Sequence, residues 1–223
     1  MLAISTWLWG DKYSESDVLK LKRGVARHLK QSHRFMVITE RERKLESDIE
    51  RHAIKDPELL SVPGCFARLR MFEKGWQENK DLDDRLVCLD LDMVITGPLD
   101  KLFDRPEPFV ILSGANSMNP CPFNGSVMLL RPGHHEEVWT SFSLEETNKI
   151  KFYKFPDDQG WIWNKVPNAA TWPCGRKSGI YAFMKPGWPM YGGLPANASI
   201  VAFPGARRPS EYKHLDWVKK HWQ

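Results

Sequence analysis

Asp90 and Asp92 are the residues whose type and spacing most directly suggest chemistry. They stand two positions apart, immediately after the apolar run 86–89, which predicts a buried strand that ends at the acidic pair. Alternate residues at the fraying end of a strand can turn toward one hard cation, and Mg²⁺ and Mn²⁺ prefer carboxylate ligands. The segment Asp90-Leu91-Asp92 therefore predicts a divalent-metal site. A solvated turn in which an aspartate caps a helix is the alternative interpretation.

The residues before this pair predict the elements that must hold it in place. Residues 2–8 form an apolar run that predicts a strand. Apolar residues then recur at helical spacing over about residues 15–31, and Ser14 with Asp17 resembles a capping box at the start of that helix. Residues 34–39 predict a second strand. Strand, helix and strand form a β-α-β unit, so the sequence predicts an α/β fold with a parallel sheet.

The rest of the chain continues this alternation. Residues 40–62 predict a charged loop or a short helix, residues 66–76 predict a helix, and Asp157 is expected to cap another helix. The remaining expectations are strands at 109–112, 127–130 and 200–203, helices at 134–150 and 214–222, and loops between short strands from 167 to 209. No repeat or linker is evident, so residues 1–223 are expected to form a single domain.

Composition excludes several classes of protein. Hydrophobic residues make up 42% and charged residues 27% of the 223 residues, which is typical of a globular chain and not of a disordered one. The 32 lysines and arginines are interspersed with 28 aspartates and glutamates, and a net charge of +4 does not indicate a nucleic-acid partner. No apolar stretch approaches the roughly 18 residues that a membrane span needs.

The cysteines and the N-terminus bear on location. The 4 cysteines are far apart and form no Cys-x-x-Cys pair, so neither a zinc ribbon nor a disulfide framework is indicated. The N-terminus has no basic segment ahead of its short apolar run, unlike a signal peptide. A cytoplasmic location is therefore expected.

The segment 90–95 also matches the aspartate-nucleophile box of haloacid-dehalogenase-like phosphatases. Those enzymes begin with this box, whereas here a β-α-β unit precedes it. The chain also lacks the Gly-Asp turn that such phosphatases place at their second acidic pair. These two differences disfavour a phosphatase that uses Asp90 and Asp92, which is kept as an alternative only because of the matching segment.

Several short motifs occur along nearly the whole chain in a particular order: Trp9-Gly10-Asp11-Lys12-Tyr13, Phe66-Ala67-Arg68-Leu69, Leu89-Asp90-Leu91-Asp92, Phe123-Asn124-Gly125-Ser126, Asp158-Gln159 and Phe203-Pro204-Gly205-Ala206-Arg207-Arg208-Pro209. Together they resemble the GT-A-fold glycosyltransferases of the glycogenin and bacterial lipooligosaccharide galactosyltransferase type, glycosyltransferase family 8 and its close relatives. The resemblance implies a mixed, mainly parallel sheet flanked by helices and a retaining, nucleotide-sugar-dependent sugar transfer.

The resemblance also implies roles for residues near the N-terminus. Trp9, Asp11, Lys12 and Tyr13 are expected to line the nucleobase pocket, with Tyr13 as a stacking partner, since an aromatic ring beside a strand end suits a flat heterocycle. A packing contact at the helix entry is the alternative for Tyr13. Arg68 is expected to steady the donor or its phosphates, and an ordinary surface arginine is its alternative.

The central motifs imply the reaction centre. Asp90, Leu91 and Asp92 would lie against the donor diphosphate, the two carboxylates holding Mn²⁺ or Mg²⁺. The bound ion would offset charge on the leaving nucleoside diphosphate. The resemblance implies that Asn124, Asp158 and Gln159 have catalytic roles at the donor sugar.

The C-terminal motif departs from the family pattern. Relatives carry a metal-ligating histidine where this chain has Ala202, and a phosphate-binding lysine where it has Arg208. Arg207 and Arg208 can grip a phosphate, but alanine ligates nothing. Two carboxylates with diphosphate and water can complete the metal site, and His214 is an alternative third ligand.

The resemblance thus implies a metal-dependent glycosyltransferase that moves a sugar from a nucleotide-diphosphate donor, expected to be a UDP-hexose, to a carbohydrate, lipid or protein acceptor. A nucleotidyltransferase is disfavoured because the turn after the first strand is too short and acidic for a phosphate loop. A nucleotide-sugar-binding protein without catalysis is a further alternative, because Ala202 replaces a ligand. The segment 214–222 is expected to dock on the domain, with peripheral membrane contact as its alternative.

Overall fold

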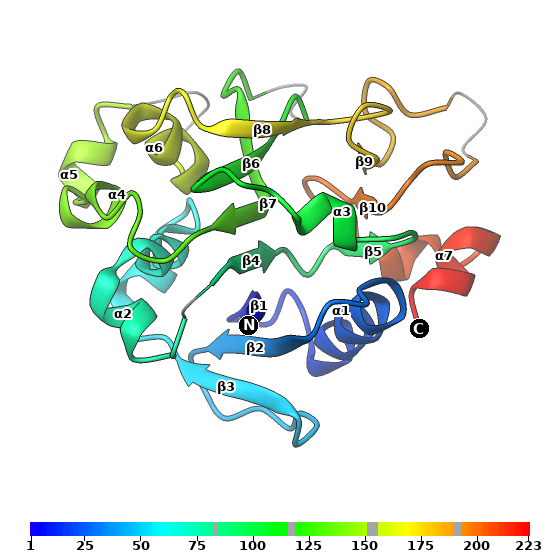
Figure 1. Ribbon diagram of the computed structural model, residues 1–223, viewed down its shortest axis with the longest axis horizontal. Coiled ribbons are helices and arrows are strands. Elements are labelled where there is room, and N and C mark those ends of the chain that lie inside the picture. Colours follow the sequence, from blue (N-terminus) through cyan, green and yellow to red (C-terminus); the bar gives the residue numbers. More distant parts are fainter. Residues whose placement is uncertain (83, 116–118, 151–155, 190–192) are drawn as a thin grey trace.

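The computed structural model describes residues 1–82, 84–115, 119–150, 156–189 and 193–223 (Figure 1). Its centre is a seven-stranded sheet in the order β3-β2-β1-β4-β7-β6-β8. The strands are β1 (Leu2–Leu8), β2 (His33–Thr39), β3 (Ile49–Ala53), β4 (Leu86–Leu89), β6 (Phe109–Ser113), β7 (Phe123–Leu130) and β8 (Ala170–Pro173). Strand β7 runs antiparallel to β4 and β6, and the other neighbours are parallel. The sheet is therefore mixed and mainly parallel, as expected.

A second, three-stranded sheet fixes the position of the acidic pair. Its order is β5-β10-β9, with β5 (Met93–Ile95), β10 (Ile200–Ala202) and β9 (Ile180–Ala182). Strand β5 begins directly after Asp92, and the Phe203 amide donates to the Asp92 carbonyl at 2.9 Å. The acidic pair is thereby held between the end of β4 in the large sheet and β5 in the small one.

Alternating side chains of the large sheet enter two separate cores. In β1, Leu2, Ile4 and Leu8 lie in one core, and Ala3 and Trp7 lie in the other. Because both faces are covered, the central strands β4 and β6 have nearly continuous apolar sequences, LVCL and FVILS.

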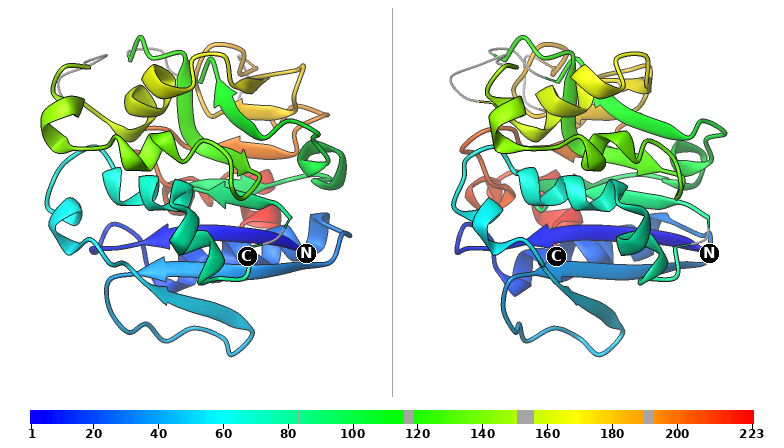
Figure 2. Two further views of the ribbon diagram at one scale, coloured as in Figure 1. Left: turned by 60° about the vertical axis from the view of Figure 1, so that its left-hand side comes forward. Right: turned by 90° about the vertical axis from the view of Figure 1, so that its left-hand side faces the viewer.

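Helices and the small sheet cover the two faces. Helices α1 (Glu15–His28) and α3 (Asp100–Phe103) pack on one face together with β5, β9 and β10. The opposite face is covered by the 3₁₀ helix η2 (Phe66–Phe72) and by α2 (Lys74–Glu78), α4 (Glu137–Thr140) and α6 (Asp158–Lys165). These helices face the viewer in the right-hand panel of Figure 2. The chain is completed by α5 (Leu144–Thr147), α7 (Asp216–His221), η1 (Pro57–Leu60) and η3 (Pro209–Tyr212).

Some helix predictions need correction. Helix α1 starts as predicted, with the Ser14 amide donating to Asp17 Oδ2 at 2.8 Å, but it ends at His28 because the Lys30 and Gln31 amides bind the Asp100 carboxylate. The predicted helix at 134–150 is two short helices, α4 and α5. The break falls at Ser143, whose extended backbone and hydroxyl cap α5.

Other segments also differ from expectation. Residues 40–62 contain the edge strand β3. Its sequence, IERHA, is charged and partly exposed, so it lacks the apolar pattern that predicts a strand. The predicted helix at 66–76 is the 3₁₀ helix η2 followed by α2. Strand β7 begins at Phe123, ahead of the predicted 127. The short strands β8, β9 and β10 confirm the expectation for 167–209.

The C-terminal helix docks on the protein, as expected. Val218 is fully buried and Trp222 is 5% exposed, in a core that they share with Val94, Tyr181, Phe183, Val201 and Phe203. The four cysteines are free. Within the described ranges, no helix has the length and apolarity to cross a membrane.

Candidate active site

The carboxyl ends of β1 and β4 meet at a cavity of about 240 Å³, here called the donor pocket. Open α/β sheets build their ligand sites at this edge. The lining side chains come from β1 and the turn after it, from the start of η2, and from the residues after β4: Trp7, Trp9, Lys12, Tyr13, Cys65, Arg68, Asp90, Leu91 and Asp92. The structure thus brings together seven residues that the sequence analysis places at the donor and the metal.

Arg68 connects the acidic pair to the start of α6. It is 6% exposed, forms an ion pair with Asp90, and donates through Nε and Nη2 to Asp158 Oδ2 at 2.8 and 2.5 Å. Burial opposes a charged guanidinium, but Asp158 and Asp90 raise the pKa of Arg68 well above its ordinary value. The alternative of an ordinary surface arginine is wrong. Arg68 is a buried cation that holds two carboxylates from distant parts of the chain.

Glycine at 125 makes this arrangement fit. Arg68 Nη1 also donates to the Gly125 carbonyl at 3.2 Å, and a Cβ at 125 would lie 2.6 Å from Arg68 Nη2. Any side chain on β7 at this point would displace the guanidinium.

Asp92 is the less compensated member of the acidic pair. It is 9% exposed and accepts a hydrogen bond from the Tyr13 hydroxyl at 3.0 Å. Burial, and next the charge of Asp90, raise the pKa of Asp92 to about 7. Burial and the neighbouring Asp92 also raise the pKa of Tyr13, so the phenol stays protonated. Tyr13 is therefore a hydrogen-bond partner of the acidic pair and not only a packing residue.

The donor set of Asp90 and Asp92 fits a hard divalent cation. Arg68 engages one oxygen of Asp90, while the side-chain partner of buried Asp92 among the described residues is a neutral hydroxyl, so the acidic pair can accept further positive charge. Among the described residues, no group of three or more His, Cys, Asp or Glu side chains could hold a metal ion. His214 lines a separate hollow with Phe183 and Trp188, and the structure does not bring it to the acidic pair. Remaining ligands would come from water and from the bound substrate.

The start of α6 carries a second polar network. Asp157 caps the helix, as predicted, by accepting from the Gly160 amide at 2.7 Å. Its other oxygen, Oδ2, accepts from Asn119 Nδ2 at 3.0 Å and from Gln159 Nε2 at 3.1 Å. The side-chain oxygen of Gln159, Oε1, accepts from the backbone amide of Gly125 at 3.3 Å. Both ends of the Gln159 amide are thus oriented by the protein.

Asp158 and Asn124 lie beside this network. Asp158 is 4% exposed, and burial raises its pKa to about 6 against the opposing effect of Arg68, so it is ionised at neutral pH. Asn124 lies on β7 and accepts from the Ser126 amide at 3.1 Å. The predicted catalytic residues therefore stand on β7 and α6, which contact one another through Gly125 and Gln159.

The remaining predicted site residues do not line the donor pocket, and they differ in how close to it they lie. Asp11 is not among the residues that line the donor pocket, and its largely exposed side chain pairs with Arg41 at 2.6 Å. Arg208 lies 5.9 Å from the centre of the Tyr13 ring, close to the pocket, whereas Arg207 makes no such contact among the described residues. Ala202 is buried in β10 opposite Met93.

Sequence reasoning missed two lining residues, Trp7 and Cys65. Trp9 follows Trp7 by two positions, just past the end of β1, and both pack in the same core, so this spacing was the available signal. Trp7 is 7% exposed, and its indole N–H has no acceptor among the described residues. Cys65 follows the Pro63-Gly64 turn, and its place at the pocket depends on the left-handed backbone there, with φ of 60°.

Comparisons with known proteins identify the fold. No family model and no curated protein matches the sequence. Among solved structures, an active-site mutant of LgtC has a TM-score of 0.63 and 14% identity, over 98% of this chain and 93% of that one. The galactosyltransferase LgtC in complex with donor and acceptor sugar analogs has a TM-score of 0.60 and 12% identity, over 99% and 96%. The chain therefore has, over nearly its full length, the GT-A fold of the galactosyltransferase LgtC.

Proposed function

We propose that this protein is a glycosyltransferase that moves a hexose from a UDP-sugar to an acceptor with retention of configuration, using Mn²⁺ or Mg²⁺. The observation that carries the proposal is the donor pocket itself. Its buried Asp92, bonded to Tyr13 and adjacent to Asp90, lies at the strand ends of a fold shared with a galactosyltransferase. LgtC has been crystallised with donor and acceptor sugar analogs, which supports a nucleotide-sugar donor and a carbohydrate acceptor here.

In this proposal the chain binds and orients the donor. Trp9 and Tyr13 would offer aromatic faces to the base, and Trp7 lines the same pocket. Arg208, whose guanidinium lies 5.9 Å from the centre of the Tyr13 ring, would bind a phosphate oxygen. Asp90 and Asp92 would hold the divalent ion, which supplies Lewis-acid stabilisation of the leaving diphosphate when bound.

The sugar would lie toward β7 and α6. Gln159, with its amide fixed by Asp157 and by the Gly125 amide, would orient the donor sugar, and Asn124 would contact it from β7. Arg68 keeps Asp158 ionised beside this position. The phosphatase alternative is not favoured, because Arg68 engages Asp90, the carboxylate that would act as the nucleophile.

Thermal unfolding with nucleotides tests the proposal. We expect UDP with Mn²⁺ to raise the melting temperature, whereas UDP alone, and GDP or CDP with Mn²⁺, raise it less. A ligand at about 100 times its Kd adds about 2.7 kcal/mol, or about 5–10 °C for a chain of this size. Release of UDP from a UDP-hexose would then separate an enzyme from a binding protein. Failure of every nucleotide to shift the transition would contradict the proposal.

Replacement of Asp157 by asparagine tests the orientation of Gln159. Asparagine still caps α6 through its oxygen, but its amide cannot accept from Gln159 Nε2. We expect kcat to fall about tenfold, the equivalent of one oriented hydrogen bond, with the KM for the donor nearly unchanged. Steady-state kinetics with varied donor concentration measure both constants.

Ser143→Ala is the matched control, since it removes the side-chain cap of α5 away from the donor pocket. It should cost about 1 kcal/mol of stability without changing kcat. Equal kinetics for Asp157→Asn and the native protein would show that Asp157 only caps the helix.

A further inference from the structure

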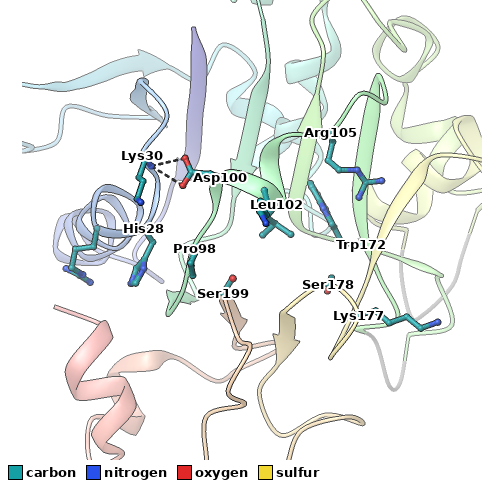
Figure 3. A pocket seen from close by; sticks show the side chains of 12 residues that line it. His28, Lys30, Pro98, Asp100, Leu102, Arg105, Trp172, Lys177, Ser178 and Ser199 are labelled. Atoms are coloured by element: carbon teal, nitrogen blue, oxygen red, sulfur yellow. Dashed lines mark hydrogen bonds between the residues drawn. The ribbon is translucent and has the colours of Figure 1, made fainter.

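A second hollow, of about 770 Å³, shares no lining residue with the donor pocket. It is bounded by the end of α1, by α3, by β8 with the turn that follows it, and by the start of β10. Figure 3 shows Lys30 and His28 on one side and Trp172 and Arg105 on the other, with Ser199 and Ser178 below. A volume of this size suits a small organic ligand.

The hollow is strongly basic. Its lining includes five cationic side chains from three segments: Arg27, Lys30, Lys101, Arg105 and Lys177. The two arginines are partly engaged, since Arg27 donates to the His221 carbonyl at 2.6 Å and Arg105 pairs with Glu107 at 2.5 Å. The three lysines are exposed and form no ion pair with the described residues. Their ammonium groups therefore stand at the hollow without an ion-pair partner among the described residues.

Asp100 does not neutralise this charge. It is the one carboxylate among the lining residues that the structure describes, and both of its oxygens accept backbone N–H groups. The Lys30 amide donates to them at 3.0 and 3.2 Å, and the Gln31 amide donates at 2.9 Å. Asp100 thus ties α3 to the end of α1 and leaves the lysine ammonium groups unpaired.

The floor of the hollow adds apolar surface and a hydrogen-bond donor. Trp172 is 2% exposed and Leu102 is 9% exposed, and Pro98 lies between them and α1. The Trp172 indole N–H is buried and has no acceptor among the described residues. A buried donor without a partner is costly in a folded protein, and a ligand in the hollow is one group that would complete this hydrogen bond. The hollow thus offers an apolar floor below a ring of positive charge.

We propose that this hollow is a second binding site, separate from the donor pocket, for a ligand that carries more than one phosphate charge. Lysine ammonium groups bind phosphate as point charges, and lysines on three different segments match an anion whose charge is spread over more than one group. The apolar floor would contact the organic part of the ligand. This site does not depend on the proposed sugar transfer, because it uses none of the donor-pocket residues.

Titration calorimetry with pyrophosphate, without added metal, tests the site. The test variant replaces Lys30, Lys101 and Lys177 by glutamine. The control variant replaces Lys44, Lys219 and Lys220, which are exposed and lie outside both pockets, so it carries the same change in net charge. We expect the Kd for pyrophosphate to rise about tenfold or more in the test variant and to stay near the native value in the control.

Trp172→Phe keeps the floor but removes the indole N–H, and it should weaken binding several-fold. A UDP titration of the test variant with Mn²⁺ should match the native protein, which separates this site from the donor pocket. Cosedimentation with phosphatidylcholine vesicles, with and without cardiolipin, whose headgroup carries two phosphates, identifies the source. Loss of cardiolipin-dependent binding in the test variant alone indicates a lipid headgroup, and loss restricted to pyrophosphate indicates a soluble ligand. Equal pyrophosphate and vesicle binding by the test and control variants would overturn the proposal.

Discussion

Replacement of Asp92 by asparagine is expected to lower sugar transfer about 10³-fold while the fold is retained. The loss corresponds to about 4 kcal/mol of transition-state stabilisation, the scale of a metal ion acting on a leaving group. Asparagine keeps the shape of the side chain and can still accept from the Tyr13 hydroxyl. It also removes a buried carboxylate that burial and Asp90 already disfavour, so the free energy of unfolding without metal should not fall.

Two measurements distinguish this result from unfolding. Initial rates of UDP release should fall in Asp92→Asn, and the Mn²⁺-dependent part of the UDP thermal shift should disappear. Asp104→Asn is the matched control, because its side chain is 83% exposed and lies outside the donor pocket. An unchanged turnover rate in Asp92→Asn would contradict the assignment of Asp92 as a metal ligand and, with it, the proposed chemistry.

The parts of the fold that the sequence predicts are those with local signals. The apolar runs of β1, β2 and β4 appear as strands because both faces of the sheet are buried. The β3 edge strand is missed because its exposed side chains are charged. The predicted long helix at 134–150 fails because a serine in the middle of an apolar pattern can cap a new helix, which periodicity alone does not detect.

The candidate site shows the same division. The order of short motifs places Tyr13, Arg68 and Asp92 together before any geometry is known, and the structure brings them to one pocket. Which groups pair is not encoded locally, because Arg68 meets Asp158 across 90 positions of sequence. The requirement for glycine at 125 is visible only in the structure, where β7 approaches the Arg68 guanidinium too closely for a Cβ atom. The sequence thus predicts which residues belong to the candidate site, whereas tertiary packing determines which of them form ion pairs and hydrogen bonds with one another.

This dependence on pairing makes Arg68 the position where substitution should cost the most stability. Arg68→Met preserves much of the side-chain volume but leaves Asp90 and Asp158 without their buried cation. Breaking a buried ion pair by removing one partner costs about 3–5 kcal/mol. For a chain of this length we expect the melting temperature to fall by about 6–20 °C. Calorimetric or circular-dichroism melting measures the change.

A surface ion pair provides the control for Arg68→Met. Arg23 pairs with Glu46 at 3.1 Å, and the Arg23 side chain is 53% exposed, so Arg23→Met should cost less than about 1 kcal/mol. Adding Asp158→Asn to Arg68→Met should recover part of the lost stability, because it removes one of the two unpaired carboxylates. Equal melting temperatures for Arg68→Met and Arg23→Met would show that Arg68 is not the cation that holds the pair.

The pH dependence of Arg68→Met gives an independent test of the same charge. In the native protein, burial holds the pKa of Asp158 at about 6, above the ordinary aspartate value of 3.8. A raised pKa in the folded state favours folding at low pH, and this contribution is lost as the pH rises through the folded-state pKa. Without Arg68 the pKa of Asp158 rises further, so the stability gap between Arg68→Met and the native protein should be wider near about pH 8 than near about pH 5. A gap that stays constant over this range would mean that the substitution acts through packing and not through the unpaired carboxylates.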